Sequence, residues 1–188
     1  SYHAYGLDII SQLPVTGFEP TVVSRPDVTI RLGDVPESLP DAVNKGVLYQ
    51  STETEFLLQI DKVARYHVRN GREIVVKLLG SSVPGDISAF ISGTVLGALM
   101  HQRRMLPIHA STVVYNEKCL VFAGISGSGK STLAAAVIRA GGSLVADDIS
   151  VIDFSGDKPA ICPAFPMIRI WEDSLKHLGI PYQEFEPV

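Results

Sequence analysis

The chain has 188 residues and a formal net charge of −4, with 46% hydrophobic and only 19% charged residues. This balance is typical of a folded protein with a large apolar core and excludes a disordered segment. The acidic charge, with no Lys/Arg run longer than a pair, argues against nucleic acid as the main partner. The longest uncharged apolar stretch covers only positions 87–100, short of the roughly 18 residues of a membrane-spanning helix, so we expect a buried helix and no membrane partner.

The first part of the chain, residues 1–85, is predicted to be a β-rich region. Short extended runs cover 28–32 and 55–60, and prolines at five positions up to residue 40 exclude long helices. Two further runs, 64–68 and 73–77, flank Asn70-Gly71, a pair typical of a type I′ turn, and therefore predict a hairpin. We expect a small antiparallel β region here, followed by a second domain over residues 86–188.

The second part of the chain, from residue 86, mixes helices and strands. A helix is expected to start at a cap on Asp86 or Ser88 and to run to about Arg104, before Pro107. Strands are expected at 111–115 and 119–123, then a glycine-rich loop, a helix over 131–140 and strands at 144–146 and 149–154. Extended residues 168–170 and a short helix over 171–178 follow. The order strand, loop, helix, strand indicates an α/β nucleotide-binding unit.

The glycine-rich loop, residues 124–131, fits the phosphate-loop pattern G-x-x-x-x-G-K-[ST] in full. Glycines let consecutive backbone N–H groups turn toward an anion, and the start of the following helix adds its positive dipole end. Lys130 can reach the β- and γ-phosphates of ATP, and the Ser131 hydroxyl can bind Mg²⁺. The residues expected to bind the nucleotide are Gly124, Ser126, Gly127, Ser128, Gly129, Lys130, Ser131 and Thr132.

Two consecutive carboxylates, Asp147 and Asp148, end the apolar strand that follows this helix. Ligand sites of α/β sheets open at the carboxyl ends of strands, so we expect the pair to face the phosphate loop. One carboxylate can contact Mg²⁺ and the other can accept a proton from an attacking hydroxyl. A helix cap or a solvated turn is the alternative interpretation of the pair.

The histidines and cysteines carry weaker signals. His109 stands between the expected helix and the next strand, and by spacing alone a structural or surface role is the simpler interpretation. The histidines and cysteines show no zinc-ligand spacing. Cys119 and Cys162 are expected to be buried thiols in a reducing cytoplasm, with a disulfide between them as the alternative. No basic, apolar signal peptide is visible at the N-terminus.

The segment from His109 to Asp148 resembles the catalytic domain of the bacterial HPr kinase/phosphorylase family. The residues that match the family's pattern are His109, the loop 124–131 and the strand end Leu144-Val145-Ala146-Asp147-Asp148. More loosely it extends from Ile87 to Trp171, where the chain is similar to small HPr-kinase-like tailoring kinases, including those of lasso-peptide biosynthesis. The resemblance implies a P-loop kinase unit in which Lys130 and Ser131 handle phosphate and Mg²⁺. It also implies Asp147 as the general base, Asp148 as a metal ligand and His109 as the group that orients the base.

The chain departs from the usual HPr enzymes at several positions. Thr132 stands in place of a Glu, Ala110-Ser111 in place of a Gly, and no glycine-rich signature loop follows Trp171. The chain stops at Pro187-Val188 without an obvious end. We therefore expect a cytoplasmic Mg²⁺/ATP-dependent kinase that phosphorylates a serine of a peptide, of the lasso-precursor kind. A true HPr serine kinase and a nucleotide-binding regulatory module without phosphoryl transfer remain as alternatives, and assembly of identical chains is left open.

Overall fold

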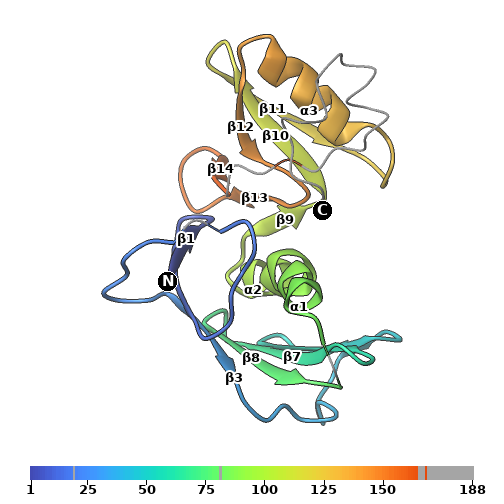
Figure 1. The fold of residues 1–188 in the computed structure, drawn as a ribbon. Helices are drawn as coiled ribbons and strands as arrows, with labels where there is room; N and C mark the ends of the chain where they lie inside the picture. Colours follow the sequence, from blue (N-terminus) through green and yellow to red (C-terminus); the bar gives the residue numbers. More distant parts are fainter. Residues whose placement is uncertain (19, 81, 165–167, 169–188) are drawn as a thin grey trace. The chain divides into compact units, whose positions relative to one another are not determined.

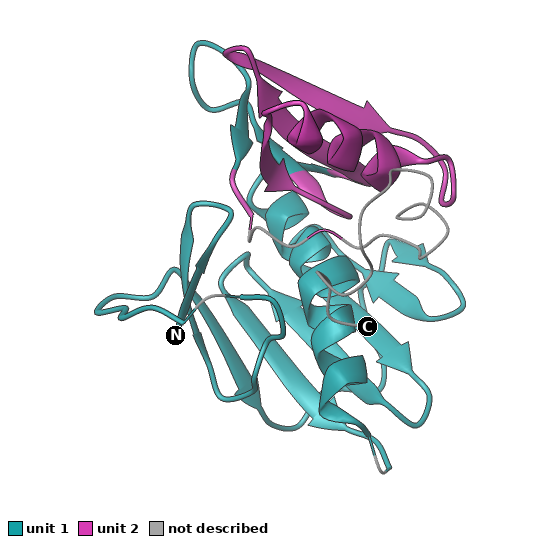
Figure 2. Ribbon diagram, turned by 45° about the horizontal axis from the view of Figure 1, so that its top comes forward, with its two compact units in different colours: residues 1–107, 151–162 teal, residues 108–150, 163–188 magenta. Residues whose placement is uncertain are grey.

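The computed structural model describes residues 1–18, 20–80, 82–164 and 168. The chain divides into two compact units, each described by itself below (Figure 2). Unit 1 comprises Ser1–Pro107 and Val151–Cys162, and unit 2 comprises Ile108–Ser150 and Pro163–Val188. The expected boundary at residue 85 differs from this division, because the helical segment that follows it groups with unit 1. The extended residues expected at 168–170 and the helix expected over 171–178 lie outside the described residues, apart from residue 168.

The main structure of unit 1 is an eight-stranded sheet with the order β1-β2-β3-β8-β7-β6-β5-β4. The strands are β1 (Tyr2–Ala4), β2 (Leu7–Ser11), β3 (Val28–Leu32), β4 (Asn44–Lys45), β5 (Tyr49–Ser51), β6 (Glu55–Ile60), β7 (Ala64–Arg69) and β8 (Glu73–Leu78). From β4 to β8 each strand pairs antiparallel with the next, as expected. The pairs β2–β3 and β3–β8, however, are parallel, so the expectation of a purely antiparallel region was wrong. Parallel neighbours need long connections between them, which local turn signals do not reveal.

The hairpin predicted around Asn70-Gly71 is confirmed. β7 and β8 pair antiparallel on either side of it, and the N–H of Arg72 donates to the carbonyl of Arg69 at 3.0 Å. Asn70 and Gly71 both adopt positive φ, 52° and 60°, as a type I′ turn requires.

Three consecutive helical segments follow the sheet: α1 (Pro84–Phe90), the π-helical turn η1 (Ile91–Val95) and α2 (Leu96–Gln102). The predicted cap on Asp86 or Ser88 was wrong. The helix begins after Val83 with Pro84 in its first turn, and the buried Ser88 hydroxyl instead accepts the N–H of Thr16 at 2.5 Å. Apolar residues recur every three or four positions on the buried side, as expected of a helix packed on a sheet. Among the described residues, no helix is long and apolar enough to cross a membrane.

These helical segments lie against one face of the sheet (Figure 1). The buried Tyr66 on β7 donates its hydroxyl to the carbonyl of Ile87 at 3.3 Å, and its ring lies 6.2 Å from that of Phe90. Burial is the main reason why the pKa of Tyr66 lies far above its ordinary value, so the phenol stays a donor. The residues Val35, Leu39, Leu57 and Val75 form a separate apolar cluster, which includes strand residues of β6 and β8.

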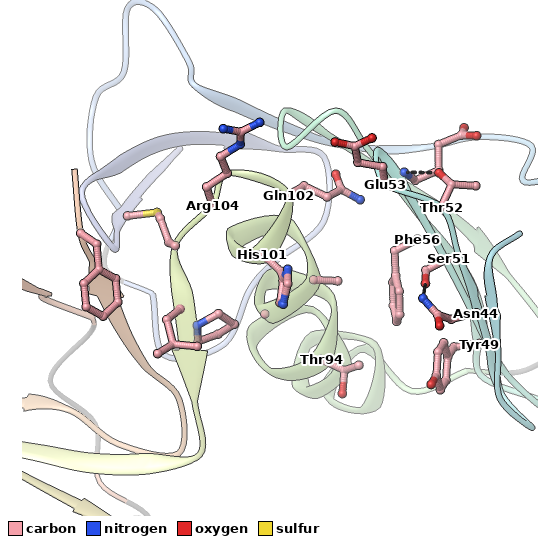
Figure 3. A pocket seen from close by; sticks show the side chains of 17 residues that line it. Asn44, Tyr49, Ser51, Thr52, Glu53, Phe56, Thr94, His101, Gln102 and Arg104 are labelled. Carbon is pink, nitrogen blue, oxygen red and sulfur yellow. Dashed lines mark hydrogen bonds between the residues drawn. The ribbon is translucent and has the colours of Figure 1, made fainter.

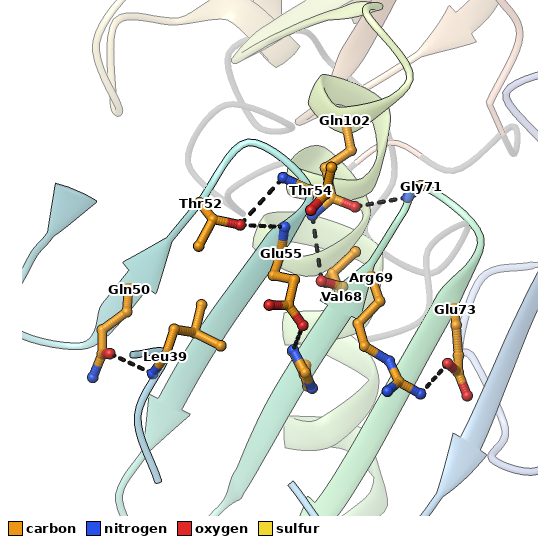
Figure 4. A network of polar contacts seen from close by, with 11 residues as sticks. Leu39, Gln50, Thr52, Thr54, Glu55, Val68, Arg69, Gly71, Glu73 and Gln102 are labelled. Atoms are coloured by element: carbon orange, nitrogen blue, oxygen red, sulfur yellow. Dashed lines mark hydrogen bonds and ion pairs between the residues drawn. The ribbon is translucent and has the colours of Figure 1, made fainter. Parts of the chain in front are cut away.

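Polar contacts tie the end of α2 to the sheet (Figure 4). The Gln102 side chain accepts the N–H of Gly71 at 2.7 Å and donates to the carbonyl of Val68 at 3.3 Å. Each of these backbone groups belongs to the β7–β8 hairpin. The helix therefore ends at a fixed position relative to that turn, since both ends of one amide are bonded.

The described part of unit 2 contains a three-stranded sheet with the order β11-β10-β12 and one helix (Figure 1). Its elements are β10 (Ala110–Tyr115), β11 (Lys118–Ala123), α3 (Lys130–Arg139) and β12 (Ser143–Ala146). β10 lies antiparallel to both neighbours, so β11 and β12 run in the same direction. The expected strands and helix are confirmed, and α3 packs on the sheet. A further sheet, β14-β13-β9, falls mostly in unit 1 and consists of β9 (Leu106–Ile108), β13 (Ser150–Asp153) and β14 (Ala160–Cys162). The described chain is thus a mixed α/β protein dominated by sheet.

The two cysteines are free thiols. Cys119 is exposed and Cys162 is half-buried, so the expectation that both are buried was wrong. Partial burial nevertheless raises the pKa of both thiols, with Asp153 adding to the effect at Cys162. Neither environment makes the thiolate form more available.

Candidate functional site

The strand directions in unit 2 bring three separate segments to one edge of the sheet. β10 begins where β11 ends, because Ala110 pairs with Ala123, and Thr112 pairs with Ala146 at the end of β12. His109 therefore lies beside the start of the phosphate loop and beside Asp147-Asp148. The convergence expected from the sequence is present in the fold.

The loop between β11 and α3 depends on glycine at two positions. Gly127 and Gly129 have φ of 78° and 87°, in the left-handed region that side chains disfavour. Gly129 is also the residue immediately before α3, so the loop leads directly into the helix N-terminus. Backbone N–H groups at the start of a helix are unpaired within it and suit an anion. Ser126 and Ser128 are exposed on this loop, and Thr132 lies in the first turn of α3.

Lys130 folds back over the loop instead of extending into solvent. Its side chain is buried, and its Nζ donates to the carbonyls of Gly124 at 3.1 Å and Ile125 at 3.0 Å. An ammonium group has three N–H donors, so these two bonds hold the charge at the loop with donor capacity in reserve.

Asp147 is buried and accepts two hydroxyl groups. Ser131 Oγ donates to Asp147 Oδ1 at 3.0 Å, and Ser111 Oγ donates to the same oxygen at 2.5 Å. Hydrogen bonds to a carboxylate are about twice as strong as neutral ones, so the two serines fix its position. Ser111 was not among the site residues expected from the sequence. Its place follows from the pairing of Thr112 with Ala146, which sets the preceding residue of β10 beside Asp147.

Asp148 lies at the centre of a tight turn that separates the two carboxylates. Its φ is 67°, and the N–H of Ile149 donates to the carbonyl of Asp147 at 2.8 Å, the geometry of a strained γ-turn. The Asp148 side chain is half exposed, and its Oδ1 lies 3.2 Å from Nδ1 of His109. The same Nδ1 lies 2.8 Å from the backbone carbonyl of Asp148. A carbonyl only accepts, so Nδ1 carries the hydrogen and Nε2 faces away from this pair.

The structure therefore groups the predicted site residues differently from the expectation. Ser131 and Asp148 were expected together at a metal ion, with Asp147 as base. In the fold Ser131 contacts Asp147, whereas Asp148 contacts His109. Behind them, the buried Ser150 hydroxyl bonds to Thr112 at 2.7 Å and donates to the carbonyl of Ala110 at 3.1 Å. Strained backbone beside buried, fully bonded polar groups is typical of a functional site.

Comparisons of the chain with protein-family models, with curated proteins and with solved structures found no match.

Proposed function

We propose that the chain is a Mg²⁺/ATP-dependent serine kinase of the HPr-kinase-like P-loop type, which acts in the cytoplasm on a peptide, of the lasso-precursor kind. One observation carries the proposal: the loop 124–131 and Asp147 meet through the 3.0 Å hydrogen bond from Ser131. In P-loop enzymes a loop Ser/Thr and a strand-end Asp hold the metal of the nucleotide complex.

The residues at this point fit Mg²⁺. A hydroxyl and a carboxylate lie side by side, and hard oxygen ligands are those that Mg²⁺ prefers. No group of three or more His, Cys, Asp or Glu that could hold a metal occurs among the described residues. That agrees with Mg²⁺, which is usually bound through one or two carboxylates together with substrate phosphates and water. When bound, the ion neutralises charge on the phosphates.

We assign the two carboxylates by their contacts. Asp147, with Ser131, is the metal-side carboxylate, and Ser111 is the residue that positions it. Asp148, paired with His109, is the proton acceptor, because its carboxylate is exposed to an incoming hydroxyl. This division of roles is the reverse of the one that the family resemblance implies.

The reaction that this arrangement supports is transfer of the γ-phosphoryl group to a serine. A bond forms between the serine Oγ and the γ-phosphorus, the bond from that phosphorus to the bridging oxygen breaks, and ADP leaves. The hydroxyl proton passes to Asp148, and His109 holds that carboxylate through Nδ1. Lys130 places its ammonium group at the loop where the phosphates bind, and the N–H groups of the loop orient them.

A protein that only binds ATP does not need an exposed carboxylate paired with a histidine beside the loop 124–131. The Asp148–His109 pair therefore favours an enzyme over a nucleotide-binding regulatory module. The acceptor is proposed to be a flexible peptide segment, since an extended serine can approach a half-exposed base. Folded HPr is the alternative acceptor.

The test is transfer of labelled phosphate from Mg²⁺-ATP, followed by mass spectrometry of candidate acceptors. Lys130→Ala is expected to lose most nucleotide affinity, because the change removes the cation that lies on the loop, whereas the exposed Lys118→Ala serves as a matched control. Phosphate on a precursor peptide supports the proposal. Transfer to folded HPr and not to peptides supports the HPr kinase, and ATP binding without transfer to either supports the regulatory module. Unchanged binding and transfer by Lys130→Ala would show that the loop assignment is wrong.

A further inference from the structure

A cavity of about 970 Å³ opens in unit 1, and no residue of the loop 124–131 lines it (Figure 3). One wall is helical: Thr94, Gly97, Ala98 and His101 line it at spacings of three or four residues, which is one face of the η1–α2 segment. The opposite wall is the sheet, where Tyr49 and Phe56 project toward the helix (Figure 3).

The cavity exists because small side chains face aromatic ones. At the end of α1, the ring of Phe90 lies 6.2 Å from that of Tyr66, so these side chains occupy the space between helix and sheet. Further along, Gly97 and Ala98 present almost no side chain to the sheet, which leaves the volume open. Protein interiors are normally close-packed, and sites for small molecules or side chains measure about 300–1,000 Å³. A volume at the top of that range has the size of a binding site.

The aromatic wall is held in place before anything binds. Tyr49 and Phe56 stack with ring centroids 5.8 Å apart and an interplanar angle of 23°. The Tyr49 ring also lies directly over Gly46, because a Cβ there would come within 2.3 Å of the ring. Tyr49 is nevertheless 43% exposed. A rigid, accessible pair of rings suits a bulky apolar or aromatic group.

In the same part of unit 1, no other strand of the described residues pairs with the outer edge of β4. β4 is the last strand in the sheet order, and Gly46 donates its N–H to the carbonyl of Tyr49 at 2.9 Å. Because hydrogen-bonding direction alternates along an antiparallel strand, the N–H and carbonyl of the preceding residue, Lys45, point to the open edge. Three apolar side chains in or next to the β4–β5 hairpin are exposed: Val43 to 78%, Val47 to 101% and Leu48 to 50%. An unpaired strand with exposed apolar neighbours is a template for an added strand.

The charged residues around this edge indicate which kind of partner can bind there. A second, smaller hollow lies on the other side of the same hairpin. The charged residues that line the two hollows are the carboxylates Glu37, Glu53, Glu55 and Asp61 and the guanidinium of Arg104. The carboxylates outnumber the cations even when Lys45 of β4 itself is included, and this excess of negative charge favours a neutral or basic partner over an acidic one.

We infer that the β4 edge and this cavity together form a docking surface for an extended, neutral or basic peptide. The peptide adds as a strand to β4 and inserts a bulky apolar or aromatic side chain between the Tyr49–Phe56 pair and the helix. The identification of this peptide as the phosphate acceptor rests on the proposed kinase function, but its binding to unit 1 does not.

The test uses the whole chain and a fluorescein-labelled positional-scanning library of short peptides, with binding followed by fluorescence anisotropy without nucleotide. Ala98→Phe fills the cavity from the helix wall, and Tyr49→Ala removes the exposed ring. Both substitutions are expected to weaken binding of the selected peptide by about tenfold or more. Ala89→Phe, an exposed position of α1 that does not line the cavity, is the matched control and should bind like wild type.

The outcomes separate this inference from the kinase proposal. Preference for aromatic and basic positions, lost in Ala98→Phe and Tyr49→Ala while a fluorescent ATP analogue binds as before, supports the docking surface. Absence of any binding peptide, a preference for acidic ones, or wild-type binding by both folded variants would overturn it. A peptide that binds at this surface but receives no phosphate leaves the docking surface standing and contradicts only the kinase proposal.

Discussion

The division of roles that we propose for the two carboxylates predicts opposite effects of two isosteric substitutions. Asp148→Asn removes the proton acceptor but keeps the shape, and asparagine tolerates the positive φ of this position. A general base contributes about 10²–10⁴-fold, so phosphoryl transfer should fall by that factor while Mg²⁺-ATP still binds. The Asp148–His109 pair is half exposed, so the free energy of unfolding should change by no more than about 1 kcal/mol.

Asp147→Asn acts at a buried acceptor of two hydroxyl groups. Loss of the carboxylate charge weakens both bonds, and a hydrogen bond to a charged group contributes about 1.5–3 kcal/mol, so unfolding should become easier by an amount of that order. The Mg²⁺-dependent part of ATP affinity should also fall, since one of the two oxygen ligands loses its charge.

Calorimetric titration with ATP at varied Mg²⁺, single-turnover transfer and urea unfolding measure the three quantities separately. The assignment would be refuted by the opposite pattern. In that pattern Asp148→Asn loses the Mg²⁺ dependence of binding and keeps its transfer rate, whereas Asp147→Asn binds normally and does not transfer.

Two further predictions concern residues outside the sequence motif. Ser111→Ala removes the 2.5 Å bond to Asp147 and should weaken Mg²⁺-ATP binding without altering binding in the absence of Mg²⁺, with recovery in Ser111→Thr, as calorimetry can measure. Equal loss with and without Mg²⁺ would mean that Ser111 only supports the fold. In unit 1, burial lowers the pKa of His67 below its ordinary 6.5, against the opposing effect of Glu55. The unfolded chain then binds the proton more readily, so the free energy of unfolding should fall as pH drops below about 6.5, and less steeply in His67→Gln. Parallel urea unfolding curves at about pH 7.5 and about pH 5.5 check this, and identical pH dependence in the variant would contradict it.

The elements that could be predicted from the sequence are those whose signals are local. Asn70-Gly71 fixes its own turn through positive φ, and the loop 124–131 fixes a strand end and a helix start within a few residues. The candidate loop residues follow from the same short pattern, because phosphate binding depends on consecutive backbone N–H groups. These features depend on neighbours in the chain and need no distant partner.

Other features depend on which distant segments pair, and no local pattern states that. The parallel pairing of β3 with β8 joins strands about forty residues apart. The helix begins at Pro84, and Ser88 bonds to the distant Thr16 instead of capping its own helix. The small residues of α2 become a cavity wall only because residues of β5 and β6 line the same cavity.

The sequence by itself predicted a loop of the phosphate-binding pattern and two strand-end carboxylates at one edge of a sheet. Only the tertiary structure decided what each carboxylate contacts. The register of β10 against β12 sets Ser111 beside Asp147, and the γ-turn at Asp148 directs the next carboxylate to His109. Adjacent residues in a chain have similar covalent surroundings, so their different contacts come from the partners that strand pairing and backbone turns bring to each.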